Sequence, residues 1–290
     1  MKFASSFLSE INLEKGKYHA FSFETSYLLK VFKQHLFAYF NNKPQLETQF
    51  LNVLDSNNKQ LSAKDFHFIS FDCHYIDLSI EKNTKSQIQK LLFHQLENNP
   101  NMVEKFLRFQ NQLSFFTNHL DLVDNELSIE FQFNEKSIFN LIKSLDIIIE
   151  FDEKEYIPNF KIRDFLIKAL LRINTEEKEP ILIISHPETD VGRMDLHYVI
   201  NMVKDLDITT IVLSSQKDFL TSATDKRLFL VNKYGNFYDI ISLRKELIEF
   251  NLIKESDSEE LVRSIALMDF NKDYQLLTGE IKNFLLSNKL

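Results

Sequence analysis

The strongest constraint on the fold is a strand, helix, strand pattern in the second half of the chain. Residues 181–185 (ILIIS) and 208–213 (ITTIVL) are short apolar runs rich in β-branched side chains, as in buried strands. The interval between them has helical periodicity over 192–205. Neighbouring parallel strands need a crossover of about a dozen residues or more, usually a helix. The pattern therefore predicts a parallel sheet of the α/β class.

Further segments are predicted to belong to the same α/β head. Residues 17–24 alternate like a strand, and Thr25 with its neighbours offers an N-cap before a helical pattern over 27–40. Additional strand-like runs lie at 66–70, 75–80 and 227–231, and an additional helical pattern lies at 158–173. The head is thus expected to combine several strands with helices that connect them.

Parallel α/β heads often bind nucleotides through a glycine-rich loop, and this sequence has no such loop. The chain has four glycines in all, Gly16, Gly192, Gly235 and Gly279. None of them falls in a G-x-x-x-x-G-K-[ST] or G-x-G-x-x-G motif, whose backbone amides cradle phosphate. The turn after the first strand begins with Glu24, which puts a carboxylate where phosphate would sit. No nucleotide cofactor is therefore expected.

Two helical regions are predicted outside the head. A long helical stretch runs from residue 84 to about 120, restarts at Asn99-Pro100 and would reach roughly 50 Å if it were straight. A second stretch over 134–145 is expected to return antiparallel to it. After residue 238 the pattern is helical at 241–253, 257–268 and 273–287. The predicted domains are an α/β head (1–80 and 151–240), an inserted helical leg (81–150) and a C-terminal helical extension (241–290).

Charge and cysteine content narrow the class of protein. The 290-residue chain has a net charge of −8, which argues against a protein that coats nucleic acid over its whole surface but allows a local basic stripe. Its single cysteine, Cys73, fits a reducing cytoplasm. No segment has the pattern of a signal peptide or of an apolar run of about eighteen residues. We therefore expect a cytoplasmic protein without a membrane span.

One polar cluster lies between two strand-like runs. Asp72, His74 and Asp77 are close together in the sequence, around Cys73. A histidine and two carboxylates are common ligands of the divalent ion in a nuclease. The spacing is unspecific, and polar residues in a turn at the end of a strand explain the same pattern.

A second polar loop follows the central strand. Residues 186–190 (HPETD) come directly after 181–185, where open α/β sheets bind their ligands. The loop is therefore a candidate for contact with a ligand or partner. A proline-containing loop that leads to a helix cap is the alternative interpretation.

Acidic residues gather in the link between the two helical stretches of the predicted leg. They are Asp124, Glu126, Glu130 and Glu135. Hard oxygen ligands at this density suit calcium better than a transition metal. A solvated acidic turn is the alternative interpretation.

Basic residues recur along the leg and are candidates for contact with DNA. The candidate DNA-binding residues are Lys82, Lys85, Lys90, Lys105, Arg108, Lys136 and Lys143. A separate basic set on 158–173 consists of Lys161, Lys168 and Arg172. Each set alone is also typical of a solvated helix face. Several copies of such a face in a symmetric assembly would neutralise duplex phosphates without a net basic charge on the protomer.

In the order and spacing of its segments, the chain resembles the Csn-two family, the spacer-acquisition proteins of type II-A CRISPR systems. The resemblance covers about residues 1–240. The segments that carry it are 7–10, 23–24, 99–100, 125–127, 141–145, 181–185 and 206–213. No single segment is diagnostic, and the order of the pieces carries the likeness.

The resemblance implies a degenerate P-loop-like α/β head, a helical leg and a homotetrameric ring that binds the ends of double-stranded DNA in a lysine-lined hole. It also implies calcium that stabilises the ring, and partnership with the adaptation integrase and the effector nuclease. Lys143 matches a basic position of the family, and Glu126, Glu130 and Glu135 match acidic positions near its calcium region. Ser128 departs from the aspartate of shorter members. The tail from about residue 241 is similar to the long form of the family.

We therefore expect a DNA-end-binding ring protein without catalysis, which acts in CRISPR spacer acquisition and so in antiviral defence. One alternative is a divalent-metal-dependent nuclease or nucleotide hydrolase on the same core, in which Asp72, His74 and Asp77 converge or ATP binds despite the missing glycine loop. The other alternative is a protein adaptor that recruits the integrase and has no affinity for DNA.

Overall fold

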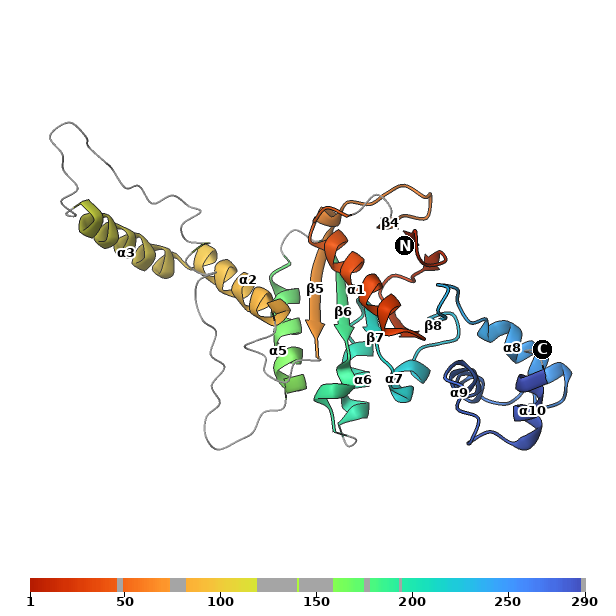
Figure 1. Cartoon of the computed structure of the whole chain (residues 1–290). Helices are drawn as coiled ribbons and strands as arrows, with labels where there is room; N and C mark the ends of the chain where they lie inside the picture. Colours follow the sequence, from red (N-terminus) through yellow and green to blue (C-terminus); the bar gives the residue numbers. More distant parts are fainter. Residues whose placement is uncertain are drawn as a thin grey trace.

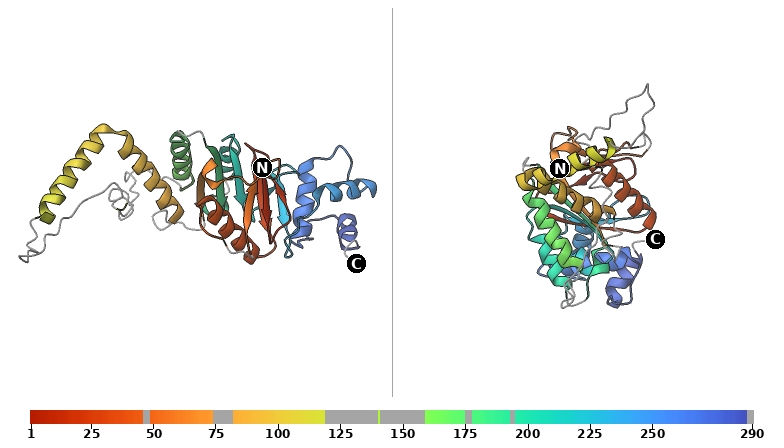
Figure 2. Two further views of the ribbon diagram at one scale, coloured as in Figure 1. Left: turned by 90° about the horizontal axis from the view of Figure 1, so that it is seen from above. Right: turned by 90° about the vertical axis from the view of Figure 1, so that its left-hand side faces the viewer.

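The computed structural model describes residues 1–45, 49–73, 82–118, 140, 159–174, 178–192 and 195–287. These residues form an α/β head, a helical arm that projects from one end of the head, and a group of C-terminal helices at the opposite end (Figures 1 and 2). The predicted fold class, an α/β head with additional helical parts, is confirmed. The domain limits stay a prediction.

A five-stranded sheet forms the centre of the head. Its strands, in spatial order, are β5 (Phe66–Asp72), β6 (Glu179–Ser185), β7 (Thr209–Leu213), β3 (Tyr18–Phe23) and β8 (Leu228–Val231). All four neighbouring pairs are parallel. The parallel pairing of β6 with β7 confirms the crossover that the sequence pattern predicts.

The order of the strands creates a switch point between β7 and β3. The chain leaves β3 through α1 (Ser26–Phe40), passes to the edge strand β5 and returns through β6 to β7. From β7 it crosses β3 to reach β8 at the opposite edge. Connections therefore leave the adjacent strands β3 and β7 in opposite directions. Open α/β sheets bind ligands at the carboxyl ends of their strands next to such a point.

Apolar layers cover both faces of the parallel sheet, which explains the continuous apolar runs of its strands. On one face, Phe21 and Ile183 pack with α1 and with a small antiparallel sheet. This sheet, in the order β2 (Ile11–Asn12), β1 (Lys2–Ser5) and β4 (Leu51–Leu54), is absent from the sequence-based prediction. On the other face, Leu182 and Val212 pack with α5 (Asn159–Arg172), α6 (Leu196–Lys204) and α7 (Lys217–Thr221).

The arm consists of two helices that meet at Asn99. They are α2 (Lys82–Asn98) and α3 (Pro100–Asn118), so the predicted restart at Asn99-Pro100 is confirmed. The Asn99 side chain accepts a hydrogen bond from the backbone N–H of Asn101 at 3.1 Å, which caps α3. Pro100 disfavours helical backbone at the residue before it. The two helices lie at an angle rather than in line (Figure 2), so a straight element of roughly 50 Å is not formed. The expected segments at 75–80 and 134–145 lie outside the described residues, apart from Asn140.

Several helix limits differ from the prediction for local reasons. Residues 187–190 form a short 3₁₀ turn, η2 (Pro187–Asp190), and α6 begins only at Leu196 rather than at 192. The C-terminal helices are α8 (Ile240–Glu249), α9 (Glu259–Phe270) and α10 (Gly279–Ser287). Asn251 and Lys272 have left-handed backbone, with φ of 55° and 59°, which ends α8 and α9. The helix predicted over 241–253 therefore ends at Glu249, and the helix predicted over 273–287 begins only at Gly279.

An arginine on α9 joins the C-terminal helices to the head. Arg263 is 9% exposed, and its Nε donates to the carbonyl of Thr221 at the end of α7 at 3.1 Å. Its Nη1 donates to Asp225 at 2.8 Å and to Glu259 at 3.3 Å. A second arginine, Arg244 on α8, lies 3.7 Å from Glu259 and 4.0 Å from Asp225. This charged network links α8 and α9 of the extension to the segment at the end of α7.

His19 on β3 makes the stability of the head depend on pH. The residue is 0% exposed, and its Nε2 accepts a hydrogen bond from the backbone N–H of Glu14 at 3.0 Å. Burial lowers the pKa of His19 to about 4. The unfolded chain therefore binds a proton more readily, and the stabilising contribution of neutral His19 is complete above about pH 6.5. As pH falls towards 4, the free energy of unfolding is expected to decrease by up to about 3 kcal/mol.

Urea denaturation at several pH values measures this effect, and the variant His19→Gln isolates it. Glutamine retains an acceptor for the Glu14 N–H and does not titrate. Burial also lowers the pKa of His67, so both proteins keep some acid sensitivity. The difference between them should grow between pH 6.5 and pH 4, and parallel pH profiles would contradict the role of His19.

Candidate functional site

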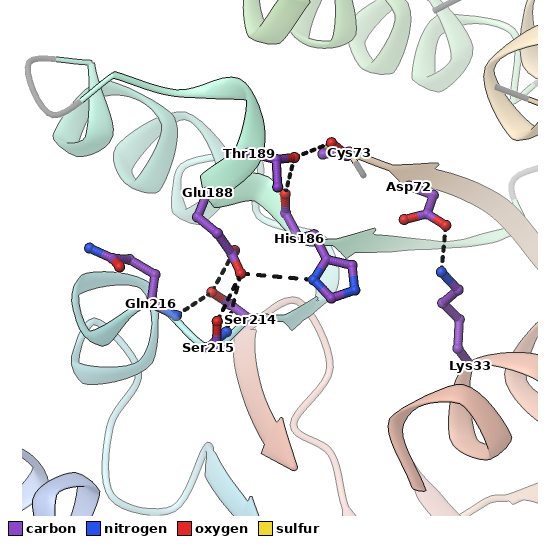
Figure 3. Close-up of polar contacts among 9 residues, drawn as sticks. All are labelled: Lys33, Asp72, Cys73, His186, Glu188, Thr189, Ser214, Ser215 and Gln216. Atoms are coloured by element: carbon purple, nitrogen blue, oxygen red, sulfur yellow. Dashed lines mark hydrogen bonds and ion pairs between the residues drawn. The ribbon is translucent and has the colours of Figure 1, made fainter. Parts of the chain in front are cut away.

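The carboxyl ends of β6 and β7 carry a compact group of polar side chains (Figure 3). His186 follows β6 directly and has left-handed backbone, with φ of 55° and ψ of 45°. This conformation is uncommon for a residue with a side chain. It leads the chain into η2, where Glu188 faces the turn after β7. The polar loop that the sequence analysis selected thus lies at the edge of the sheet where α/β proteins bind ligands.

The Glu188 carboxylate is held by three groups from the turn after β7. The Ser214 hydroxyl donates to it at 2.7 Å, and the backbone N–H and hydroxyl of Ser215 each approach it at 3.3 Å. The Nδ1 of His186 lies 3.9 Å from the same carboxylate, a distance for an ion pair rather than a hydrogen bond. Burial alone raises the pKa of Glu188, but the His186 ring and the serine donors outweigh it and hold the pKa below its ordinary value.

The end of β5 lies beside this group and contains an ion pair. Lys33 of α1 donates to Asp72, the last residue of β5 (Figure 3). Asp72 pairs in register with Ser185, the last residue of β6. The Thr189 hydroxyl contacts the carbonyl of Cys73 and lies 2.9 Å from the carbonyl of His186. The ends of β5, β6 and β7 are therefore joined into one polar row.

The Ser214 hydroxyl of this polar row does not form a serine–histidine pair with His186. The Ser214 hydroxyl donates to Glu188 rather than to His186, so the imidazole does not activate it. Within the described ranges, no three His, Cys, Asp or Glu side chains converge as metal ligands. Asp72 instead pairs with Lys33. Its proposed metal partners, His74 and Asp77, lie outside the described residues, so the nuclease alternative gains no support here.

The turn from β3 to α1 occupies the place that a phosphate-binding loop would take. Thr25 is the N-cap of α1, and its side chain accepts a hydrogen bond from the N–H of Leu28 at 3.3 Å. The carboxylate of Glu24 accepts from the backbone N–H of Lys233 at 2.8 Å and lies 3.9 Å from the ammonium of Lys272. A tight turn and an internal carboxylate thus replace the glycine-rich loop whose amides would cradle phosphate.

The candidate DNA-binding residues that are described lie on both helices of the arm. Lys82 begins α2. On α2, Lys85 is partly exposed and Lys90 is exposed, and on α3 Lys105 and Arg108 are exposed. Arg108 donates to Glu104 on the same helix at 2.6 Å. At 3.6 residues per turn, Lys85 and Lys90 lie about 140° apart around α2, so they do not form one stripe.

The charge of Lys90 acts on the head, although its side chain is exposed. The pKa of Lys90 is lowered by burial of the ammonium. After burial, the charge of Lys90 is the next cause that lowers the pKa of His67 on β5. α2 packs against β5 and α5 of the head. Lys105 and Arg108 on α3 are therefore better placed for phosphate contact than Lys90.

The second basic set is only partly available for contact with phosphate. Lys161, Lys168 and Arg172 are all on α5, and all three side chains are exposed. Lys168, however, donates to Asp164 one turn earlier at 2.7 Å. This hydrogen bond raises the pKa of Lys168. The carboxylate thus offsets one of the three positive charges on this helix.

The remaining candidates lie outside the described residues. These are Asp124, Glu126, Ser128, Glu130, Glu135, Lys136 and Lys143. The fit of calcium to the acidic cluster therefore stays a prediction.

Two features of the site are missing from the sequence-based prediction. One is the pairing of Lys33 with Asp72, which joins residues far apart in the chain. The other is the role of Ser214 and Ser215, which bind Glu188 from the neighbouring strand end. The sequence does contain a signal for the role of the two serines. They directly follow the run at 208–213, and parallel strands have their carboxyl ends at one edge of the sheet, beside the loop after 181–185.

Among the helices that the structure describes, none has the length and apolar character needed to cross a bilayer. No protein-family model matches the sequence, and no curated protein matches it. The crystal structure of Stu0660 of Streptococcus thermophilus is similar to the chain, with a TM-score of 0.62 and 12% sequence identity. The similarity covers 100% of this chain and 93% of that chain. At this identity the likeness shows a shared fold.

Proposed function

We propose that the chain is a CRISPR-associated protein that binds the ends of double-stranded DNA during spacer acquisition and has no catalytic activity. The observation that carries this proposal is the likeness to Stu0660, a CRISPR-associated Csn-two protein, over the whole length of the chain. The order of sequence segments that resembles the Csn-two family supports it independently, since it does not depend on coordinates.

The mechanism would be electrostatic and independent of base sequence. Lys105 and Arg108 are exposed on α3, the part of the arm farther from the head (Figure 1), and Lys85 on α2 is partly exposed. Lysine and arginine contacts to phosphates position a duplex without reading its bases and make the affinity depend on salt. In a homotetrameric ring, several arms would surround one duplex and compensate for the net charge of −8 on each chain.

The proposal includes partners that the resemblance implies. Calcium would bind the acidic residues Glu126, Glu130 and Glu135 and stabilise the ring. The adaptation integrase and the effector nuclease would bind the loaded ring. The competing function is that of a protein adaptor without affinity for DNA. One DNA-binding experiment distinguishes the two functions.

The experiment compares linear duplex DNA with covalently closed circles of the same sequence, at moderate salt, with calcium and then with chelator. A ring that loads from ends should bind linear DNA and leave the circles free, because a closed circle offers no end to thread. Blocking both ends of the linear duplex with a bulky protein should abolish binding. If calcium supports the ring, chelator should weaken binding to the linear DNA.

The other outcomes of this experiment would support a different mode of DNA contact or a different function. Equal binding to linear and circular DNA would replace threading with contact from the side. Absence of binding to both would overturn the DNA-binding proposal in favour of the adaptor. Shortened DNA that appears only with a divalent ion would favour the nuclease.

A further inference from the structure

The Glu188 carboxylate is held in the way that proteins bind an oxyanion ligand. Its partners, the Ser214 hydroxyl and the N–H and hydroxyl of Ser215, come from the β7–α7 turn, whereas Glu188 comes from the separate turn after β6 (Figure 3). His186 adds an imidazole at 3.9 Å. Hydroxyl and backbone N–H donors that converge on one point are typical of sites for carboxylate or phosphate groups.

The donors are set in place by the head itself. Ser214 is 6% exposed, and its hydroxyl oxygen accepts a hydrogen bond from the backbone N–H of Gln216 at 3.0 Å. That bond directs the hydroxyl proton of Ser214 outward, towards the carboxylate of Glu188. The position also suits a ligand, since it lies at the carboxyl ends of β6 and β7, beside the switch point of the sheet.

A cavity lies against the same turn. Its volume is about 140 Å³, and Ser215 and Lys217 line it together with Leu267 and Met268 of α9. Ser215 therefore contacts Glu188 and also forms part of the cavity wall. The rest of the lining consists of Ser264, Asn271, Asp273 and Leu276. A ligand whose anionic group replaced the Glu188 carboxylate would find space for a small body next to the apolar side chains, with the positive charge of Lys217 and the negative charge of Asp273 in the cavity wall.

We propose that the β7–α7 turn forms a binding site for the oxyanion group of a small molecule and that Glu188 fills this site as an internal ligand. The ligand class is a phosphate monoester or a carboxylic acid with a small body. Because Glu188 is tethered a few residues from β6, its effective concentration exceeds that of free anions. Inorganic phosphate alone should therefore not displace it from the intact protein, and the site should open to free anions once the carboxylate is removed.

The test removes the internal ligand and supplies an external one. In Glu188→Ala, inorganic phosphate at constant ionic strength should raise the melting temperature by about 3 °C more than in the unchanged protein, as expected for binding at about ten times the dissociation constant. Phosphorus NMR should show line broadening only with this variant. Acetate in place of phosphate distinguishes a carboxylate site from a phosphate site.

Two further variants separate this site from general salt effects. Glu188→Gln keeps a side chain of the same size in the site and should not gain phosphate-dependent stability. The double variant Glu188→Ala with Ser214→Ala should not show the phosphate response, because a main donor is absent. Phosphate stabilises many proteins without binding to a site, and the unchanged protein measures that contribution.

A folded Glu188→Ala variant that responds to phosphate and acetate no more than the unchanged protein would overturn the proposal. If the variant is unfolded at low ionic strength, the same titration decides the question through its circular dichroism, since phosphate should restore the folded spectrum of Glu188→Ala but not that of the double variant Glu188→Ala with Ser214→Ala. The inference does not rest on DNA binding, because its readouts use neither DNA nor the arm.

Discussion

Replacement of Arg263 by alanine is expected to lower the free energy of unfolding by about 3–5 kcal/mol. Arg263 is almost fully buried and donates to the Thr221 carbonyl, to Asp225 and to Glu259. Without the guanidinium, the Asp225 carboxylate, whose side chain is 12% exposed, stays buried, and its remaining ion-pair partner among the described residues is the more distant Arg244. A buried charge that loses its partner is more costly than the pair was favourable.

Thermal and urea denaturation, followed by circular dichroism, measure this effect. The matched control is Arg244→Ala, which removes the same group from the same network. The Arg244 side chain is 26% exposed, lies 3.7 Å or more from its acidic partners and donates to the carbonyl of Glu255 at 3.5 Å, so its loss is expected to cost about 1 kcal/mol or less. Arg263→Lys should fall between the two, because lysine retains the charge but not the planar fork. Equal stability of the two alanine variants would mean that the network does not fix the extension to the head.

The central sheet is predictable from the sequence because its strands are buried on both faces. Residues 181–185 and 208–213 are then apolar at most positions of the pattern, whichever face a side chain points to. The small sheet gives no such signal. β2 has two residues and β1 has four, and β1 pairs with β4 about fifty positions later, with Phe3 opposite Val53. Such short strands form through tertiary contacts rather than through local pattern.

The site is predictable only where a single segment carries the signal. Residues 186–190 stand out because they follow a central strand, and the structure confirms their place at the carboxyl edge. The partners of Glu188 come from the end of β7, so its role depends on two strands ending side by side. Arg263 shows the same limit, since an arginine in a helical pattern suggests a solvated face until the tertiary structure places Asp225 beside it. Which buried charges pair with one another depends on the tertiary packing. The periodicity of the sequence gives no information about these pairs.

Reversal of three charges on the arm, Lys85→Glu, Lys105→Glu and Arg108→Glu, is expected to weaken binding to linear duplex DNA roughly 100-fold at moderate salt, if each residue contacts one phosphate at about 1 kcal/mol. The dependence of log K on log salt should also become shallower, by about one unit for each phosphate that is no longer neutralised. Lys90 is left unchanged, because its ammonium lies near His67 of the head and its reversal would disturb packing as well as charge. Fluorescence anisotropy with a labelled duplex at several salt concentrations measures both quantities.

The control is the triple variant Lys245→Glu, Lys254→Glu and Lys282→Glu, which lowers the net charge by the same amount. These three side chains lie at least partly exposed on or beside the C-terminal helices, at the opposite end of the head from the arm. If the arm is the DNA interface, the control should lose little affinity and keep its salt slope, since charges beyond a Debye length of about 8 Å are screened at physiological salt. Equal losses in both variants would show that net charge alone governs binding. A loss confined to the control would move the interface from the arm to the C-terminal helices.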